Sequence, residues 1–418
     1  MQGSIRVLPS SLQGVTKAPP SKSYAQRAVA AAILGKTETV ITGFPENLDS
    51  AASLGIAEGL GARVHKRGND LCISPGVRQP SSTLDCRESG LAMRMFTPLA
   101  ALQDRSFTLV AHGTLSGRPM DFMEKPLADL GAVCRTDRGM APVFVKGPVR
   151  GGNTVVENPL TSQFLTGLLL ALPCAENDSS VTVRGLSSTP YVAMTMELLR
   201  ESKVVVEWMK GNTFIIPGRQ TYSLERYKVE GDWSGAAFLL VAGAISGSVT
   251  VEGLNPASAQ GDSCILTALE LAGAEVNTGD AGITAGAGAL RPFRFCVSHC
   301  PDLAPPLAVL AACCPGTSIL SGTDRLSFKE SDRTATITEE LVKIGVNAVK
   351  GRDFIEITGG DIRGGIASSR GDHRIAMALS VAALRSREGV RIQCPESVEK
   401  SYPMFYRDLS ALGGITVE

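Results

Sequence analysis

The sequence predicts an α/β protein made of six copies of one unit, with its sheets outside and its helices inside. In each copy a short polar turn opens an alanine- and leucine-rich helix, and a β-branched strand follows. The turns begin at residues 21, 88, 161, 232, 301 and 372, so a period of about 70 residues runs through the chain. The opening helices are apolar on every face, which indicates burial among strands rather than one solvent-facing side.

The first copy shows the expected order of elements. A helix over Ser21–Leu34 precedes a strand over Thr37–Phe44 and a second helix over Leu48–Leu60. A hairpin of Ala62–Lys66 and Asp70–Ser74 then closes the unit. The alternation of helical and strand patterns within about 70 residues is typical of βαβ-type units.

The third copy repeats this order. Its helices are expected over Phe164–Leu172 and Tyr191–Ser202, with a strand over Ser180–Gly185 between them. The hairpin strands are expected over Lys203–Trp208 and Thr213–Pro217. A Gly-Asn pair between these strands suits the positive φ angles of a tight hairpin turn.

The length of 418 residues indicates two domains, because a single core rarely grows so large. Three copies in each domain place the boundary near residue 228. We expect one domain over residues 16–227 and the other over residues 1–15 plus 228–418, with the N-terminal strand Ile5–Pro9 belonging to the second.

Charge and composition exclude several classes of protein. Lys plus Arg and Asp plus Glu both count 41, and no basic run occurs, so neither nucleic acid nor an anionic membrane is an expected partner. The longest apolar run, Phe164–Ala171, is too short to span a bilayer. No secretory signal begins the chain, so we expect a cytoplasmic protein.

The ten cysteines are interpreted as packing residues rather than metal ligands. Cys72, Cys174, Cys264, Cys296 and Cys394 lie in or beside apolar stretches. The cluster of Cys296, Cys300, Cys313 and Cys314 near His299 lacks the paired spacing of a zinc site. We expect no metal and no cofactor.

The helix openings carry the candidate chemistry. Six helix N-termini bring unpaired backbone N–H groups and partial positive charge, which favour anions. The loops that start the second helices begin at Asp49, Arg118, Tyr191, Arg333 and Lys400. A basic residue at a helix N-terminus opposes the dipole unless an anion lies between them.

Cations recur at equivalent positions of the copies. Any one of them is more often solvated or in a salt bridge, but a set in register with a repeat indicates polyanionic ligands with phosphate and carboxylate groups. The cations are Lys22, Arg27, Arg94, Arg118, Lys329, Arg333, Arg374 and Lys400, and the accompanying acids are Asp49, Asp302, Glu330 and Asp332.

Four of these segments resemble motifs of the 5-enolpyruvylshikimate-3-phosphate (EPSP) synthase family, in order and over the whole chain. They are Pro20-Ser21-Lys22-Ser23 with Arg27, Thr161-Ser162-Gln163-Phe164, Lys329-Glu330-Ser331-Asp332-Arg333 and Gly371-Asp372-His373-Arg374-Ile375-Ala376-Met377. The resemblance implies an inside-out α/β barrel fold with two similar domains, each of three βαβαββ repeats. It implies transfer of the enolpyruvyl group of phosphoenolpyruvate to the 5-hydroxyl of shikimate 3-phosphate, with release of phosphate, in the shikimate pathway to chorismate and aromatic amino acids.

The resemblance also implies roles for individual residues. Shikimate 3-phosphate is expected to be bound by Lys22, Ser23, Arg27, Thr161, Ser162, Gln163, Ser188, Tyr191, Asp302 and Lys329. Phosphoenolpyruvate is expected to be bound by Lys22, Gly90, Arg118, Gln163, Arg333, Arg374 and Lys400. Asp302 resembles the general base, Glu330 and Lys22 the proton shuttles, and Lys400 the partner of the leaving phosphate. Which of these groups protonates the methylene carbon is left open by the sequence.

The sequence departs from the family at the second opening, where Glu88-Ser89-Gly90-Leu91 stands for the usual Asn-Ala-Gly-Thr. Glycine at 90 lets backbone N–H groups approach a phosphate. Ser89 and Leu91 add bulk beside it. We therefore expect glyphosate to inhibit this protein more weakly than a Ser89→Ala, Leu91→Thr double variant.

Two alternatives remain. The sister enzyme that acts on UDP-N-acetylglucosamine would carry Lys-Asn in the first opening and a cysteine in the loop before Arg118, but this loop reads Gly-Thr-Leu-Ser-Gly. An inactive polyanion-binding scaffold would lose Asp302 or Glu330, and both are present. We expect a monomer whose two domains both contribute ligands and close on the substrates.

Overall fold

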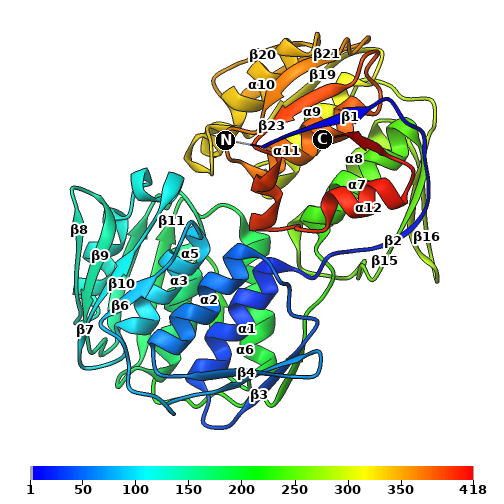
Figure 1. Ribbon diagram of the computed structural model, residues 1–418. Coiled ribbons are helices and arrows are strands. Elements are labelled where there is room, and N and C mark those ends of the chain that lie inside the picture. The colour runs from blue at the N-terminus through cyan, green and yellow to red at the C-terminus, as the bar shows by residue number, and fades with distance from the viewer. Residues whose placement is uncertain (1–2, 418) are drawn as a thin grey trace. The chain divides into compact units, whose positions relative to one another are not determined.

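The computed structural model describes residues 3–417 and shows two compact units (Figure 1). The first unit is Pro20–Val229, and the second combines the residues up to Pro19 with those from Glu230 onward. The breaks expected from the sequence, after residues 15 and 227, lie a few residues before these boundaries. Within the described chain no helix is both long enough and apolar enough to cross a membrane.

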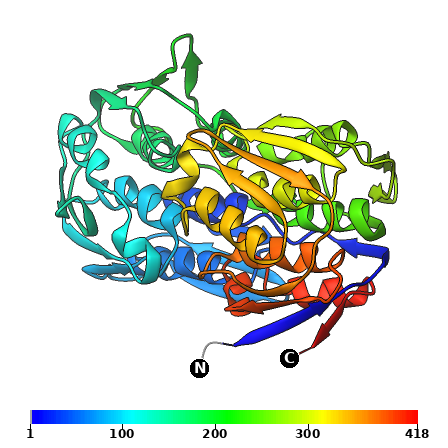
Figure 2. The ribbon, with the colours of Figure 1, turned by 90° about the horizontal axis from the view of Figure 1, so that it is seen from above.

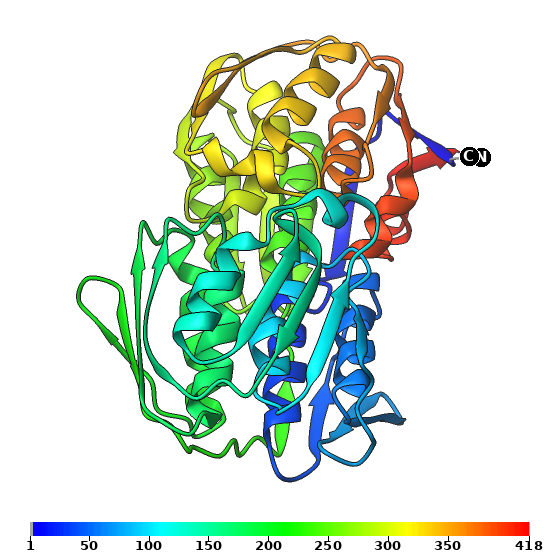
Figure 3. The same cartoon turned by 90° about the vertical axis from the view of Figure 1, so that its left-hand side faces the viewer.

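Mixed four-stranded sheets form the first unit. In spatial order the strands are β14 (Arg226–Lys228), β3 (Thr39–Thr42), β5 (Asp70–Ser74) and β4 (Arg63–Arg67); β6 (Thr83–Asp85), β7 (Ser106–Val110), β9 (Met140–Lys146) and β8 (Val133–Asp137); and β10 (Gly152–Glu157), β11 (Ser179–Arg184), β13 (Thr213–Ile216) and β12 (Glu207–Met209). The first pair of each sheet is parallel and the other pairs are antiparallel. Figure 3 shows β6–β9, in cyan, outside the helices of this unit.

The second unit repeats the same sheet pattern. Its strands are β2 (Leu12–Lys17), β15 (Gly247–Glu252), β17 (Gly282–Gly286) and β16 (Glu275–Gly279); β18 (Arg294–Cys296), β19 (Gly316–Ser321), β21 (Phe354–Gly359) and β20 (Asn347–Lys350); and β22 (Gly365–Ser368), β23 (Val390–Gln393), β1 (Ser4–Leu8) and β24 (Ile415–Val417). Strand β1 lies between β23 and β24, so both ends of the chain enter one sheet (Figure 2).

The opening helices form the interior of each unit. They are α1 (Lys22–Leu34), α3 (Gly90–Ala100) and α5 (Gln163–Ala171) in the first unit, and α7 (Trp233–Ser246), α9 (Ala304–Ala312) and α11 (His373–Ala383) in the second. Every residue of α3, α7, α9 and α11 is buried. Helices α3 and α5 pack together, as do α7, α9 and α11. The opening helices are apolar on every face because other elements of their unit surround them. The predicted inside-out arrangement is confirmed.

The second helices are shorter or partly exposed. They are α2 (Leu48–Gly59), α4 (Glu124–Asp129), α6 (Thr189–Glu201), α8 (Ile265–Leu271), α10 (Arg333–Lys343) and α12 (Phe405–Ala411). Short 3₁₀ turns lie between the elements: η1 (Gly113–Gly117), η2 (Asp121–Met123), η3 (Leu172–Cys174), η4 (Gly261–Cys264), η5 (Pro301–Leu303), η6 (Asp324–Phe328) and η7 (Pro395–Lys400).

Side-chain caps explain why several opening helices begin where they do. Ser89 Oγ accepts from the N–H of Ala92 at 3.3 Å, and Asp232 Oδ2 accepts from the N–H of Gly235 at 3.1 Å. Asp372 Oδ1 accepts from the N–H of Arg374 at 3.0 Å. Each bond satisfies an N–H that the first turn of a helix leaves open.

Two expectations about local structure need correction. Arg118 and Lys400 begin the loops that lead to α4 and α12, as predicted, but these helices start only at Glu124 and Phe405, so neither cation lies at a helix N-terminus. A cation at the carbonyl end of a turn is favourable without any anion, so the dipole argument fails at these two positions. The predicted strand Lys203–Trp208 forms only as Glu207–Met209, because the side-chain amide of Gln220 bonds both the N–H and the C=O of Val205 in place of a strand.

The interpretation of Cys296 as a packing residue is also wrong, since this side chain is exposed. It lies on the edge strand β18, where Phe295 is half-buried and its two neighbours are exposed. Alternate residues of a strand face opposite sides, so only one in two can reach the core. Cys72, Cys300 and Cys314 are buried.

Candidate active site

In the first unit Lys22 occupies the first position of α1 and reaches across to α2. Its Nζ lies 2.8 Å from Asp49 Oδ2, and the two side chains are 14% and 11% exposed. Asp49 lies in the first turn of α2, where a carboxylate also complements the helix dipole. The pair therefore holds a partly accessible ammonium group at the opening of α1.

Arg27 is buried one turn further along α1 and connects three helices. Its guanidinium donates to Thr195 Oγ1 (3.1 Å), Thr166 Oγ1 (3.3 Å) and the carbonyl oxygens of Ser23 (2.8 Å) and Tyr191 (3.1 Å). Burial lowers the pKa of Arg27 to about 10, because these neutral oxygens replace only part of its hydration. An anionic ligand beside this group would offset that cost.

Two further guanidinium groups converge on Gly90 at the start of α3. A Cβ at Gly90 would lie 3.2 Å from Nη1 of both Arg94 and Arg118, and 3.6 Å from Gln163 Oε1. Arg94 Nη1 donates to Gln163 Oε1 at 2.9 Å, which joins α3 to the first residue of α5. The absent side chain leaves backbone N–H groups and cations around one small volume, which suits a phosphate or carboxylate.

The structure also locates the residues at which the second opening departs from the family. Ser89 is buried, caps α3 and accepts from Gln26 Nε2 at 3.4 Å. The carboxylate of Glu88 packs against Gly113, where a Cβ would lie 2.4 Å from Glu88 Cδ. Gly113 has φ 52°, so both space and backbone conformation require glycine opposite Glu88.

The remaining candidate residues of the first unit lie at the openings of α5 and α6. Thr161 Oγ1 accepts from the N–H of Gln163 at 3.3 Å, and Ser162 is buried beside it. Ser188 precedes α6 with φ 54°, and its carbonyl accepts from the N–H of Tyr191 at 3.1 Å. These groups lie at the openings of α5 and α6, the two helices that Arg27 also contacts.

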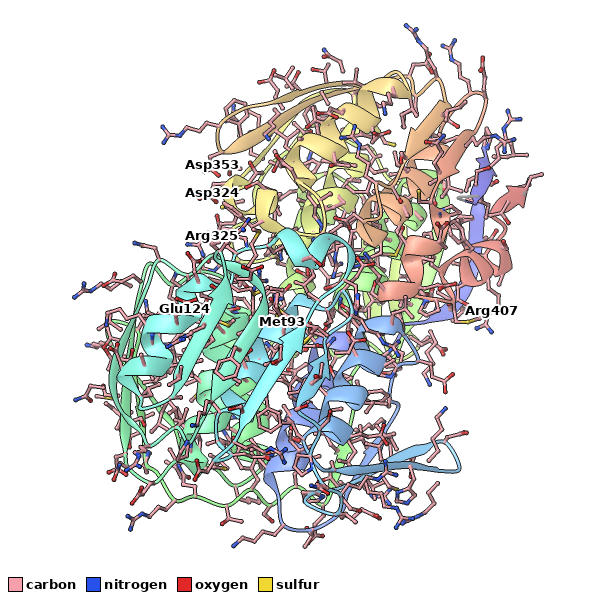
Figure 4. The ribbon with its side chains drawn as sticks, turned by 60° about the vertical axis from the view of Figure 1, so that its left-hand side comes forward. Met93, Glu124, Asp324, Arg325, Asp353 and Arg407 are labelled. Atoms are coloured by element: carbon pink, nitrogen blue, oxygen red, sulfur yellow. The ribbon has the colours of Figure 1, made fainter. Side chains whose placement is uncertain are left out.

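In the second unit Asp302 lies in the 3₁₀ turn η5 that leads into α9. Its Oδ1 is 2.6 Å from Arg333 Nη1 and 3.4 Å from Lys329 Nζ, and its Oδ2 is 3.0 Å from Arg374 Nη2. Lys329 follows η6, whose first residue Asp324 lies beside Arg325 and Asp353 in Figure 4.

Opposing effects act on the Asp302 carboxyl. Burial by itself raises its pKa, but Arg374, Lys329 and Arg333 together hold the pKa well below its usual range. In this arrangement Asp302 is firmly ionised and weakly basic. Any ligand that draws these cations away would raise its basicity.

Arg333, the first residue of α10, is 1% exposed and surrounded by acids. Besides Asp302 it contacts Asp372 (Nε to Oδ2, 2.8 Å) and Glu330 (Nη2 to Oε2, 2.5 Å). Burial lowers its pKa, but these carboxylates outweigh that effect and raise it well above the ordinary value. Carboxylates of the protein therefore supply the anion expected at this helix N-terminus.

Lys400 and Arg374 complete this group. Lys400 is 9% exposed, and its Nζ donates to the carbonyl of Gly371 at 3.0 Å. Arg374 lies in the first turn of α11, immediately after the cap Asp372. The structure thus brings Asp302, Lys329, Glu330, Arg333, Arg374 and Lys400 to one side of the second unit's helix openings.

The sequence reasoning did not assign a role to Asp262, a buried carboxyl in the turn η4. Ser234 Oγ donates to its Oδ2, and its Oδ1 has no hydrogen-bond partner. Burial first, and then the charge of Asp302, raise the pKa of Asp262 to about 7. Its position in the sequence could have indicated a role. Asp262 precedes the second helix of the fourth copy, and the other copies carry candidate residues at the corresponding place.

One group of side chains among residues 3–417 has the composition of a metal site. Glu38, His65 and Cys72 offer ligand atoms within 4.8 Å of one another on the sheet of β3, β4 and β5. Glu38 is already engaged by Arg67 (2.8 Å) and Ser74 (3.1 Å). Because a metal ion would have to displace that cation, the group carries no argument for function.

Taken together, the geometry defines a two-unit α/β protein whose helix openings carry clusters of Lys, Arg and acids suited to small phosphate- and carboxylate-bearing molecules. Comparison with known proteins gives the family. Residues 8–409 match the family described as EPSP synthase (3-phosphoshikimate 1-carboxyvinyltransferase). The chain belongs to this family.

Individual relatives agree over their full lengths. The chain is 36% identical to 3-phosphoshikimate 1-carboxyvinyltransferase of Methanocella arvoryzae, covering 98% of both chains, and 33% identical to that of Clostridium beijerinckii, covering 99% and 98%. The solved EPSP synthase of Acinetobacter baumannii is 27% identical, with a TM-score of 0.82 and complete coverage of both chains. The enolpyruvyl transferase NikO of Streptomyces tendae, 17% identical with a TM-score of 0.78, shares the fold.

Proposed function

We propose that this protein transfers the enolpyruvyl group of phosphoenolpyruvate to the 5-hydroxyl of shikimate 3-phosphate, giving 5-enolpyruvylshikimate 3-phosphate and phosphate. The observation that carries the proposal is membership of the EPSP synthase family over nearly the whole chain. The clusters of cations and acids supply groups of the kind that this chemistry needs.

The binding roles proposed for the two substrates follow the helix openings. Arg27, with Ser23, Thr161, Ser162, Gln163, Ser188 and Tyr191, is assigned to shikimate 3-phosphate, together with Lys22, Asp302 and Lys329. Gly90 and Arg118, with Lys22, Gln163, Arg333, Arg374 and Lys400, are assigned to phosphoenolpyruvate. Arg94 joins this second set, because its Nη1 lies as close to the Gly90 position as that of Arg118.

The reaction requires removal of the 5-hydroxyl proton and addition of a proton to the methylene carbon. We assign the first step to Asp302 and the proton movements that follow to Glu330 and Lys22. Binding of phosphoenolpyruvate near Arg333 and Arg374 would share their charge between Asp302 and the ligand, and this would raise the pKa of Asp302 toward the range useful for a base. Lys400 would then stabilise the departing phosphate.

Phosphate release in the presence of phosphoenolpyruvate tests this function. Release with shikimate 3-phosphate, and none with UDP-N-acetylglucosamine, is the expected result. Release only with the sugar nucleotide would favour the sister activity. Binding of either anion without turnover would favour an inactive scaffold. Repeating the assay with glyphosate tests the weaker inhibition expected from Ser89 and Leu91, which stays a prediction.

A further inference from the structure

Glu340 is a fully buried carboxylate that the proposed reaction does not use. It lies in α10, two turns after Arg333, and is 0% exposed. Its Oε1 accepts from Lys343 Nζ at 2.8 Å and Arg370 Nε at 3.0 Å, and its Oε2 accepts from the N–H of Ser368 at 2.8 Å. A buried charge is tolerated only when it is paired and hydrogen-bonded, so Glu340 holds Ser368 and Arg370 in place.

The segment held by Glu340 has an unusual backbone conformation. Arg370 has φ 49° and Gly371 has φ 74°, so two successive residues are left-handed. Glycine adopts this conformation freely, but a long side chain rarely does unless its surroundings fix it. Here the guanidinium of Arg370 contacts both Glu340 and the exposed Glu339. The Glu340–Arg370 pair, which we call the brace, therefore fixes this turn.

The braced turn connects to three proposed ligands of phosphoenolpyruvate. The carbonyl of Gly371 accepts from Lys400 Nζ at 3.0 Å. The next residue, Asp372, accepts from Arg333 Nε at 2.8 Å and from the N–H of Arg374 at 3.0 Å. Because Arg333 begins the helix that also carries Glu340, the contacts form a closed ring through α10, the turn and the start of α11.

We propose that the brace is a positioning element for phosphoenolpyruvate: Glu340 and Arg370 set the directions of Lys400, Arg333 and Arg374 without contacting a substrate. The proposal rests on the proposed function. A change in the turn moves the Gly371 carbonyl and the Asp372 carboxylate together, so all three cations shift at once. Displacements on the ångström scale at such groups cost about 100-fold in rate.

Steady-state kinetics of Arg370→Ala and Arg370→Lys test the brace in the full-length protein. Arg370→Ala should lower kcat/KM for phosphoenolpyruvate by about 10- to 100-fold, while KM for shikimate 3-phosphate stays within about twofold. Arg370→Lys keeps a cation beside Glu340 and should recover part of the loss. Two matched controls are used. Lys343→Ala removes another cation that contacts Glu340 and that lies on the same helix, α10. Glu339→Ala removes the exposed carboxylate that contacts Arg370.

Amide hydrogen exchange gives a readout that does not depend on turnover. Exchange of the N–H groups of Asp372 and Arg374 should accelerate in Arg370→Ala and stay unchanged in Lys343→Ala. If Arg370→Ala matches the Lys343→Ala control in both kinetics and exchange, or if both KM values rise equally, the brace has no positioning role. A wild-type protein without phosphate release would instead overturn the proposed function.

Discussion

The role of general base proposed for Asp302 conflicts with the surroundings of its carboxylate in the structure. A general base needs a pKa near the working pH, yet Arg374, Lys329 and Arg333 hold the pKa of Asp302 well below its usual range. The conflict is resolved if phosphoenolpyruvate competes for the same arginines. The strength of the base then depends on the second substrate being bound, which limits proton transfer to the complete complex.

Replacement of Asp302 by Asn should therefore lower kcat by about 100-fold or more, the usual scale for a lost general base, while shikimate 3-phosphate still binds. Turnover is measured by phosphate release and binding by calorimetry. Asp324→Asn, which removes an exposed carboxylate of the same unit, is the control and should leave kcat unchanged. Near wild-type turnover in Asp302→Asn would rule out the assigned role.

Asp262 makes a prediction about pH and stability. Its folded-state pKa of about 7 lies above the ordinary aspartate pKa of 3.8, so folding favours its protonated form. Its contribution to stability is fully present below about pH 4 and is lost as the pH rises through 7. Asp262→Asn cannot ionise, and its melting temperature relative to wild type should rise by about 2 °C or more between pH 4 and pH 8.

Melting curves at several pH values measure this difference directly. Asp324→Asn serves again as the exposed control. A difference between Asp262→Asn and wild type that is the same at every pH would show that Asp262 ionises without penalty in the folded protein.

At the scale of single elements, the sequence located the buried helices well because their ends have local causes. Serine and aspartate caps and unbroken apolar stretches specify α1, α3, α7 and α11 from neighbouring residues alone. The extent of the short strand β12 was predicted wrongly because Gln220, 15 residues further along the chain, bonds the backbone of Val205 in place of a neighbouring strand. No local pattern contains that contact.

The candidate site likewise has a part that the sequence could predict and a part that it could not. Its cations could be predicted from the repeat, since equivalent openings carry equivalent charges. The pairing of those cations could not be predicted, because Arg333 meets Asp302 from the start of its own copy and Asp372 from the next copy. Asp262 was missed because its unusual property comes from burial and from the charge of Asp302, and neither is visible in a sequence.

The cap of α3 gives a prediction about an element. Ser89→Ala removes the acceptor for the N–H of Ala92 and the contact with Gln26, and should reduce the free energy of unfolding by about 1 kcal/mol. Urea denaturation measures the change. Ser116→Ala, which alters an exposed serine in the same unit, should have less than half that effect. Equal effects would mean that the cap is replaced by another acceptor.

At the scale of the whole molecule, the two units differ in how the chain supplies their sheets. Every strand of the first unit lies within Pro20–Val229, including β14, which joins the sheet of β3. The second unit needs β1 and β2 from the other end of the chain. A central strand of one sheet and an edge strand of another therefore come from residues 4–17.

This difference predicts the behaviour of fragments. Residues 20–229 alone should unfold cooperatively in urea, whereas residues 230–418 alone should not. Residues 230–418 followed by a short glycine-serine linker and residues 1–19 should regain a cooperative transition, because this order restores β1 beside β24, where Arg6 pairs with Val417. Circular dichroism follows each transition. A cooperative transition in residues 230–418 alone would show that β1 and β2 are dispensable.

The position of β1 also has a consequence during synthesis. Ser4 pairs with Gln393, so β1 leaves the ribosome long before its partner strand β23 has been made. At translation rates of about 5–20 residues per second, that interval is roughly 20–80 s. The first unit can fold during this time, and β2 can pair once β15 has been made, but β1 remains an unpaired strand. Unpaired strand edges are prone to aggregation, so the nascent protein is most exposed to binding by chaperones before β23 and β24 emerge.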